Sequence, residues 1–305
     1  MLREVLLSLL NFSFWLALPA AVLKLWRSIY RPREWEAKGR GIVITGASSG
    51  IGEELAYQYA KQGSRLVLCA RREGELKAVA EKCESLGAQL VHYTLADVSK
   101  TDDCKRLMEE AAEKCGGVID MIVLNAGISM GVPFEDVEDL AIFRRLMEVN
   151  YYGCVDCTHF ALPFLKKSTH AKILVISSLA GKGGVPHRSG YCASKFALHG
   201  FYETLRQELS PKYPIGVTLV CPGFVNTNIN ATRLGPNPTT FDISKAMPVE
   251  EAGRIIVSAV RNGKREEVFT REGKIGEWVR FFLPELYDAA AIRKIAVETK
   301  RTDQH

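Results

Sequence analysis

The sequence predicts an α/β fold, a doubly wound parallel sheet covered by helices on both faces. Short apolar runs rich in β-branched residues alternate with helical patterns through most of the chain. These runs are unbroken rather than alternating in polarity, which is typical of strands buried on both faces of a parallel sheet. The chain has 305 residues, 47% of them hydrophobic and 25% charged, so it can bury a substantial core.

The order of the elements favours parallel pairing. A helical pattern follows each of the first apolar runs, and a helix between two strands provides the crossover that parallel strands need. Strands are expected, in chain order, at 41–45, 65–70, 89–95, 121–125, 173–177 and 215–220. Helices are expected at 52–62, at 73–85 ending at Gly87, at 100–114, and from about residue 140.

The amino-terminal residues predict a membrane anchor. No charged residue occurs from Val5 to Leu23, and a helix of this length spans about 28 Å, close to the thickness of a bilayer's hydrocarbon layer. Trp26 and Tyr30 then fall near the interface, where amphipathic rings prefer to lie. A cleaved signal peptide is one alternative, but no A-x-A cleavage site follows. A helix lying flat on the membrane is another, but the stretch has no charged face.

Positive charge gathers on the carboxyl-terminal side of this stretch. Lys24, Arg27, Arg31 and Arg33 lie there, so the positive-inside bias places the rest of the chain in the cytosol. The glycosylation sequon at 230–232 would instead need a lumenal domain. Because that sequon falls in an expected active-site loop, we expect it to be unused.

A glycine-rich turn follows the first expected strand, and a helix begins at once. The turn reads Thr-Gly-Ala-Ser-Ser-Gly-Ile-Gly over residues 45–52. Glycines let the backbone approach a pyrophosphate, and the helix amino terminus supplies unpaired N–H groups. A purely structural turn is the alternative, but the strand–turn–helix context favours a dinucleotide cradle. The expected cofactor contacts are Gly46, Ser48, Ser49, Gly50, Ile51 and Gly52.

The end of the second expected strand indicates which dinucleotide binds. NAD enzymes commonly place an acid there for the ribose hydroxyls, whereas this strand runs into Arg71 and Arg72. Arg71 can meet a 2′-phosphate, with help from Arg72 and Ser48. A solvated arginine pair at the start of a helix is the alternative. The pattern favours NADP(H).

Tyr191 and Lys195 predict proton-transfer chemistry. At i and i+4 of a helix their side chains share one face, and an ammonium beside a phenol favours the ionised phenol. Ser178, thirteen residues before Tyr191, could hold a carbonyl oxygen as charge develops on it. Ser177 is the alternative hydroxyl, and Asn150 alone could be a helix cap.

Taken together, these motifs resemble the short-chain dehydrogenase/reductase family over about residues 40–265. The similarity covers the cofactor loop, the acid that reaches the adenine, the central sheet motif, the catalytic residues in order and spacing, and the segment that covers the nicotinamide. Beyond the cofactor loop, the matched residues are Asp97, Val98, Asn125, Ala126, Gly127, Asn150, Ser178, Tyr191, Lys195, Pro222, Gly223, Val225 and Thr227. The anchor and residues 181–189 resemble the membrane-anchored dehydrogenase/reductase member 7 and 7B branch.

The resemblance implies a Rossmann-type dehydrogenase/reductase domain at 41–270, after an anchor at 1–30 and a linker at 31–40, and before a helical extension at 271–305. It implies an NADP(H)-dependent carbonyl reductase or alcohol dehydrogenase at the endoplasmic reticulum membrane. Tyr191 would be the general acid and base, Lys195 would hold the nicotinamide ribose, and Asn150 would hold a water. A homodimer through helices around 150–165 and 191–209 is also implied.

The substrate is expected to be a lipophilic ketone or alcohol, such as a steroid, a retinoid or a related lipid. Ile128, Ser129, Met130, Val185, Pro186 and the segment 224–247 are expected to line its pocket. Two alternatives stay open: a membrane-tethered NADPH-binding scaffold with little turnover, and a 3-ketosphingoid-base reductase. An oxidising steroid or retinol dehydrogenase is a further possibility.

Other kinds of site are not expected. The net charge of +5 is modest and no basic run is interleaved with aromatics, which argues against nucleic-acid binding. Cys154 and Cys157 form a CxxC pair that could indicate metal or redox chemistry. No second pair follows, and this one lies in a helical stretch, so we expect packing residues and no metal site.

Overall fold

The computed structural model describes residue 22 and residues 34–227, 229, 233–235 and 246–302, with the side chains of 294–302 left out. Contacts divide the chain into two units, Met1–Glu34 and Trp35–His305, and the second unit is described below. The predicted anchor, apart from Val22, and the sequon lie outside the described residues. No helix of the described part combines the length and the apolar character that crossing a bilayer requires.

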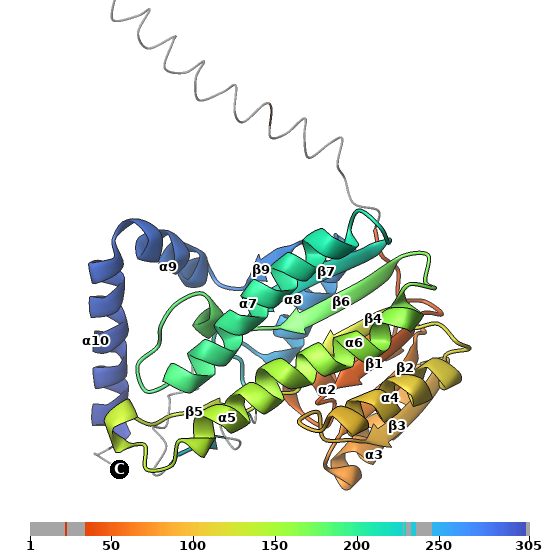
Figure 1. Ribbon diagram of the computed structural model, residues 1–305, viewed down its shortest axis with the longest axis horizontal. Coiled ribbons are helices and arrows are strands. Elements are labelled where there is room, and N and C mark those ends of the chain that lie inside the picture. Colours follow the sequence, from red (N-terminus) through yellow and green to blue (C-terminus); the bar gives the residue numbers. More distant parts are fainter. Residues whose placement is uncertain (1–21, 23–33, 228, 230–232, 236–245, 303–305) are drawn as a thin grey trace, which may run out of the picture. The chain divides into compact units, whose positions relative to one another are not determined.

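A seven-stranded parallel sheet forms the centre of the fold (Figure 1). Its order is β3-β2-β1-β4-β6-β7-β9, and every neighbouring pair is parallel. The strands are β1 Gly41–Thr45, β2 Arg65–Ala70, β3 Leu90–Leu95, β4 Met121–Leu124, β6 Ala171–Ile176, β7 Ile215–Cys221 and β9 Glu266–Val268. The chain winds outward in one direction from β1 and in the other from β4, so their carboxyl ends form the switch point where α/β folds bind ligands.

Helices bury both faces of the sheet, as the unbroken apolar strands predict. One core cluster joins the sheet to α4, α6 and α7, and the other joins it to α2, α3 and α8. The helices are α2 Gly50–Ala60, α3 Glu73–Ser85, α4 Thr101–Lys114, α5 Ala141–Met147, α6 Gly153–Leu165, α7 Ser189–Leu209, α8 Val249–Arg261, α9 Arg271–Phe282 and α10 Pro284–Thr302. Cys154 and Cys157 are buried in α6 and belong to the first cluster.

The long helix expected from about residue 140 is interrupted. Between α5 and α6 the chain forms one wide π-helical turn, η2 Glu148–Tyr152, which contains Asn150. Single π-turns inside helices occur most often at functional sites. A two-stranded sheet, β5 Ser129–Met130 with β8 Arg233–Leu234, was not expected from the sequence either. It connects the residues after β4 to the segment that follows β7.

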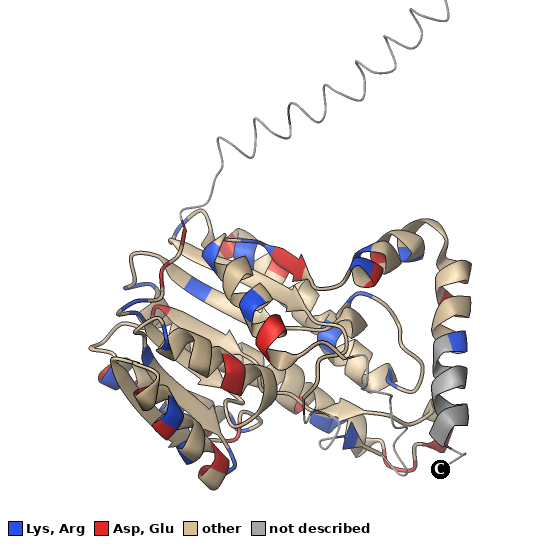
Figure 2. Cartoon of the chain, turned by 180° about the vertical axis from the view of Figure 1, so that it is seen from behind, with Lys and Arg blue, Asp and Glu red and all other residues tan. Residues whose placement is uncertain are grey.

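The carboxyl-terminal helices α9 and α10 lie beside the loop that leads into α7, away from the sheet (Figure 1). Acidic and basic residues are mixed along α9 (Figure 2). Several of its large apolar side chains are exposed: Ile275, Trp278, Phe281 and Phe282. None of its residues belongs to the two core clusters, and its contacts include the loop, β9 and α7.

Candidate functional site

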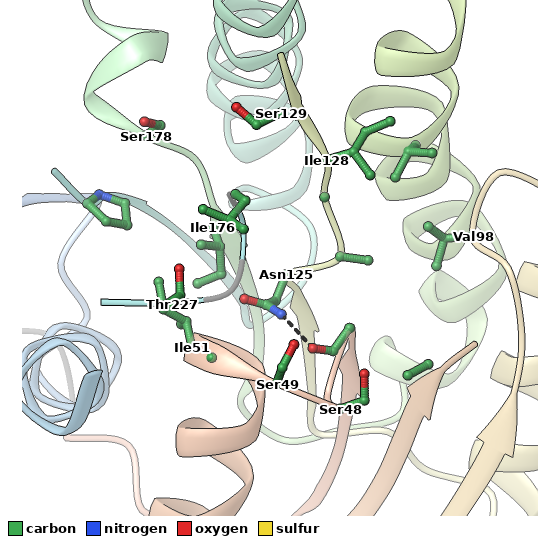
Figure 3. Close-up of a pocket in the computed structure, with 18 of the residues that line it drawn as sticks. Ser48, Ser49, Ile51, Val98, Asn125, Ile128, Ser129, Ile176, Ser178 and Thr227 are labelled. Carbon is green, nitrogen blue, oxygen red and sulfur yellow. Dashed lines mark hydrogen bonds between the residues drawn. The ribbon is translucent and has the colours of Figure 1, made fainter. Parts of the chain in front are cut away.

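A cavity of about 480 Å³ opens at the carboxyl ends of the strands, within the range of ordinary small-molecule sites. It extends from the turn after β1 to the amino-terminal part of α7. Figure 3 shows Ser48 and Ser49 at one end of the cavity and Ser178 and Ser129 at the other. A single space therefore joins the predicted cradle to the predicted proton-transfer residues.

The glycines of the cradle fit only because they lack a Cβ. Gly46 has φ +65°, and a Cβ there would lie 2.8 Å from the Cα of Ala126. A Cβ on Gly52 would lie 2.5 Å from the Asn125 amide nitrogen. Ser49 precedes α2 but makes no side-chain hydrogen bond to its first turn. The first-turn N–H groups are therefore left for another acceptor, as an anion site at a helix amino terminus requires.

Arg72 is the arginine that reaches the cradle. Its Nη2 donates to the hydroxyl of Ser48 at 3.0 Å and to that of Ser49 at 2.8 Å, and its Nη1 lies 3.3 Å from Glu75. Arg71 points to a different partner, with Nη1 3.7 Å from a carboxylate oxygen of Asp97. A guanidinium and two hydroxyls thus converge on one corner of the cavity, a donor set suited to a phosphate.

Asp97 and Val98 follow β3, where the sequence places the adenine contacts. The Ser99 amide and hydroxyl donate to Asp97 Oδ1 at 3.1 and 2.8 Å. Burial opposes ionisation of this carboxyl, but the two Ser99 hydrogen bonds and the Arg71 charge outweigh it, so the pKa of Asp97 is below its ordinary value. The carboxylate is therefore held ionised as a hydrogen-bond acceptor at the cavity edge.

Asn125 fastens the turn after β4 to the cradle. Its Nδ2 donates to the carbonyls of Thr45 and Gly46, both at 3.0 Å, and its backbone N–H donates to the Thr45 hydroxyl at 3.0 Å. A dashed line in Figure 3 marks a hydrogen bond from the Asn125 side chain. Asn125 thus fixes the two central strand ends relative to each other, and Ala126 and Gly127 continue the floor.

Tyr191 and Lys195 share one face of α7, as their spacing predicts. Lys195 Nζ lies 5.8 Å from the centre of the Tyr191 ring and donates to the carbonyl of Ile176 at 2.9 Å. Both residues are almost fully buried, with 5% of Tyr191 and 4% of Lys195 exposed, yet both line the cavity. The β6 carbonyl thus holds the ammonium at this distance from the tyrosine ring.

Ser178 begins the short helical turn η3 Leu179–Gly181. Its hydroxyl oxygen accepts the Ala180 N–H at 3.1 Å, which leaves the hydroxyl hydrogen to donate to another acceptor. The neighbouring Ser177 is engaged elsewhere, since its hydroxyl lies 3.0 Å from His199 Nε2. Of the two serines considered from the sequence, Ser178 is the one whose hydroxyl can serve the cavity.

Asn150 lies behind the cavity and does not line it. Its Oδ1 accepts the Ile128 N–H at 2.8 Å, and its Nδ2 donates to the Ile128 carbonyl and the Ser194 hydroxyl, each at 2.9 Å. A Cβ on Gly127 would lie 3.3 Å from that Oδ1 and 3.8 Å from Lys195 Nζ. Asn150 therefore ties the residues after β4 to the helix that carries the tyrosine and lysine.

The segment after β7 closes the cavity from the other side. A Cβ on Gly50 would lie 3.1 Å from the Thr227 side chain, so this segment approaches the cradle. Val225 pairs with Met247 in a parallel bridge. Pro222, Gly223, Val225 and Thr227 all line the cavity.

All the predicted site residues except Gly52 and Asn150 line this one cavity. Ile128 and Ser129 line it as expected for substrate residues, whereas Met130, Val185 and Pro186 do not. The sequence prediction did not include six further lining residues: Cys69, Ala70, Ala96, Val149, Ile176 and Arg188. The first three and Ile176 lie at strand carboxyl ends, a signal that could have been used.

The cavity residues fit a nicotinamide dinucleotide. Glycines allow close backbone approach at the cradle, donors converge at the Arg72 corner, and a tyrosine, a lysine and a serine lie at the far end. The diphosphate would lie against Gly46–Gly52, the adenine half toward Asp97, and the nicotinamide half toward Lys195.

Comparisons with known proteins agree with this architecture. A family model described as "short chain dehydrogenase" matches residues 40–237. An Arabidopsis thaliana protein named 11-beta-hydroxysteroid dehydrogenase-like 4A is 40% identical over 93% of this chain and 95% of its own length. A Dictyostelium discoideum protein named dehydrogenase/reductase SDR family protein 7-like is 36% identical over 82% of this chain and 80% of its own length.

Solved structures show the same fold. A short-chain dehydrogenase/reductase from Burkholderia phymatum in complex with NAD matches with a TM-score of 0.75 and 25% identity, over 83% of this chain and 96% of that one. An alcohol dehydrogenase from Thermococcus sibiricus complexed with 5-hydroxy-NADP matches with a TM-score of 0.67 and 26% identity, over 76% of this chain and 95% of that one. With the family model covering most of the catalytic domain, the prediction from the sequence is confirmed: the chain belongs to the short-chain dehydrogenase/reductase family of oxidoreductases.

Proposed function

We propose that this protein is an NADP(H)-dependent oxidoreductase that interconverts a lipophilic ketone and its alcohol, with Tyr191 as general acid and base. One observation carries the proposal: a single cavity joins the Arg72, Ser48 and Ser49 corner to the Tyr191, Lys195 and Ser178 end. Relatives named as steroid dehydrogenases support a CH–OH or C=O substrate.

The protein's own residues supply the proton chemistry and the charge stabilisation. When bound, the nicotinamide cofactor supplies or accepts the hydride. In the reductive direction the Tyr191 hydroxyl gives its proton to the substrate carbonyl oxygen, and the Ser178 hydroxyl donates a hydrogen bond to the same oxygen as negative charge develops. The Lys195 ammonium, held by the Ile176 carbonyl, stabilises the phenolate that remains. Oxidation of an alcohol uses the same groups in reverse.

The choice of NADP(H) over NAD(H) rests on the arginines. Arg72 already contacts the hydroxyls of Ser48 and Ser49, and a 2′-phosphate at this corner would accept hydrogen bonds from all three. Arg71 lies next to it at the cavity edge, about half exposed and 3.7 Å from Asp97. Asp97 is the carboxylate at this edge nearest the expected adenine.

A lipophilic substrate suits the far end of the cavity. Ile128, Val149, Phe224 and Ile229 line the cavity, as Tyr191 does. Burying such surface favours an apolar ligand body, with the polar atoms of Ser178 and Tyr191 left to fix the carbonyl. A steroid, a retinoid or a 3-ketosphingoid base would each meet these requirements.

The cellular setting completes the proposal. The uncharged stretch from Val5 to Leu23 and the basic residues after it support a single-pass anchor in the endoplasmic reticulum membrane with the catalytic domain in the cytosol. A homodimer through α6 and α7 is proposed from the family resemblance. Tyr152, just before α6, and Phe196, within α7, are exposed and would gain burial there.

The main alternative is a membrane-tethered NADPH-binding scaffold with little turnover. The two proposals differ in one measurement: NADPH consumption by the purified protein over a panel of steroid, retinoid and ketosphingoid carbonyls, with product masses recorded. In the oxidoreductase, Tyr191→Phe lowers kcat by at least about a hundredfold and leaves NADPH affinity unchanged. Tyr213→Phe, at a half-buried tyrosine outside the cavity, is the matched control. NADPH binding without turnover of any carbonyl would favour the scaffold.

A further inference from the structure

The loop at 182–188 joins the two halves of the proposed proton-transfer site. It follows η3, which Ser178 begins, and it leads into α7, which carries Tyr191. Arg188 at its end lines the cavity. A displacement of this loop would therefore change the distance between Ser178 and Tyr191 and the shape of the cavity's substrate end.

Lys182 fastens the start of this loop to the carboxyl-terminal part of the chain. Its Nζ lies 2.8 Å from Glu266 Oε1 on β9 and 3.1 Å from Glu277 Oε1 on α9. Burial alone would lower the pKa of Lys182, but the two carboxylates outweigh it and the pKa is raised. The lysine therefore stays cationic. All three side chains are only 25–30% exposed, so solvent screens these pairs less than it does pairs on the open surface.

Tyr287 of α10 fastens the middle of the loop. Its hydroxyl lies 3.5 Å from the carbonyl of Gly184, and its ring packs directly on the backbone of Gly183. A Cβ on Gly183 would overlap the tyrosine hydroxyl and would lie 2.7 Å from Cζ. A Cβ on Gly184 would meet no atom within 4 Å. Tyr287 can thus occupy this position only because residue 183 has no side chain.

Leu179 makes a third contact, next to Ser178. A Cβ on Gly273 of α9 would lie 2.9 Å from Leu179 Cδ2, so the leucine packs on this glycine. The hydroxyl of Thr270 accepts the Gly273 N–H at 2.9 Å and begins α9 at this point. Ion pairs, an aromatic ring and a leucine therefore connect η3 and the loop that follows it to α9 and α10, which lie outside the main core.

We propose that Lys182 and Tyr287 are positioning residues through which α9 and α10 hold the loop 182–188, whose last residue, Arg188, lines the cavity, so that the carboxyl-terminal helices determine which substrates the cavity accepts. The effect on substrate choice rests on the proposed function, whereas the holding of the loop by Lys182 and Tyr287 does not depend on that function. Neither residue touches the predicted cofactor contacts, so their loss acts on substrate binding and leaves the cradle intact. Bulky carbonyl compounds, which fill the substrate end, depend on the loop more than small ketones do.

The first test compares two alanines in the same loop. Gly183→Ala displaces the Tyr287 side chain, whereas Gly184→Ala adds the same methyl group in open space. Neither glycine has a positive φ, so backbone strain does not separate the two variants. Hydrogen exchange of the full-length protein is measured over residues 179–190. We expect at least about tenfold faster exchange in Gly183→Ala and no change in Gly184→Ala. Tyr287→Ala should match Gly183→Ala, and the double variant should add nothing. Equal exchange in both glycine variants overturns the proposal, and this readout needs no turnover.

The second test separates positioning from general stability. Lys182→Met is expected to raise KM for a bulky ketone about three- to tenfold, with a smaller change in kcat and no change in NADPH affinity. Lys182→Arg, which keeps the charge, should restore most of the KM. The same substitutions should leave KM for a small ketone nearly unchanged. An equal effect on both ketones, or no rescue by arginine, contradicts the proposal, while absence of turnover in the wild-type protein contradicts the proposed function instead.

Discussion

The side-chain amide of Asn150 binds both backbone groups of Ile128, accepting its N–H at 2.8 Å and donating to its carbonyl at 2.9 Å. The second amide hydrogen goes to the hydroxyl of Ser194 on α7. Asn150 thereby acts as a short strand, pairing with the residue just beyond β4. The wide η2 turn contains Asn150.

Replacing Asn150 by alanine should therefore cost stability as well as activity. The substitution leaves buried backbone groups of Ile128 without partners, and we expect a loss of about 2–4 kcal/mol in the free energy of unfolding. Urea unfolding measures it. Asn262→Ala is the control, because Asn262 is exposed and bonds only within its own turn; it should lose less than about 1 kcal/mol. Similar losses in both variants would contradict the role assigned to Asn150.

Gly46→Ala should abolish NADPH binding, and the strain of a positive φ alone should not account for this loss. Gly46 and Gly87 both have positive φ, +65° and +98°, but only at Gly46 would a Cβ strike backbone atoms. Gly87→Ala should cost about 1 kcal/mol of stability with unchanged affinity, while Gly46→Ala displaces the turn after β4. Fluorescence titration with NADPH measures the affinity of both variants. If Gly46→Ala bound NADPH as tightly as the wild-type protein does, the glycine-rich turn would not be part of the cofactor site.

Arg72→Gln should weaken NADPH binding about 10- to 100-fold, because it removes charge-assisted hydrogen bonds to the phosphate corner. NADH affinity should not change. Arg71→Asp puts an acid where NAD enzymes commonly have one. This variant should bring the affinities for NADPH and NADH closer together. Equal affinities of the wild-type protein for NADPH and NADH would refute the phosphate role of both arginines.

The stabilising effect of Asp97 should vary with pH in a defined direction. Its pKa is lower in the folded protein than the ordinary value, so its contribution is complete above about pH 4 and is lost as the pH falls through the folded pKa. Asp97→Asn should be less stable than the wild-type protein at pH 7, and the difference should shrink below about pH 4. Thermal unfolding from pH 3 to 7 measures this. A difference that grows on acidification would contradict the assignment.

The sequence was informative where chemistry repeats along the chain. β1, β2 and α3 have the expected bounds, since apolar runs and a terminal glycine define them. The η2 turn has no sequence signature, because its extra backbone residue depends on what Asn150 meets in space. The strand β9 was not expected because Glu266–Val268 is too short and too acidic to resemble a buried strand.

The site shows the same division. Motif spacing was enough to predict that Tyr191, Ser178 and the cradle share one site, and all of them line one cavity. It predicted Arg71 as the main phosphate contact with Arg72 assisting, whereas Arg72 is the arginine that contacts Ser48 and Ser49 and Arg71 lies 3.7 Å from Asp97. The direction in which each side chain leaves the end of β2 cannot be read from spacing. Arg188 enters the cavity from a loop, and no periodicity or motif marks such a position.

The sheet order also bears on how the chain is made. β1 has β2 on one side and β4 on the other, and Ile42 of β1 pairs with Met121 of β4, 79 positions later in the chain. During synthesis the cradle strands emerge first, and Tyr191 and Lys195 leave the ribosome only after β6 has been added. The turn and strands of the cradle are therefore made well before α8, which completes the core cluster behind them, and before the segment at 222–227, which closes the cavity. A cofactor that binds the complete cavity would stabilise the pairing of early and late parts of the chain together.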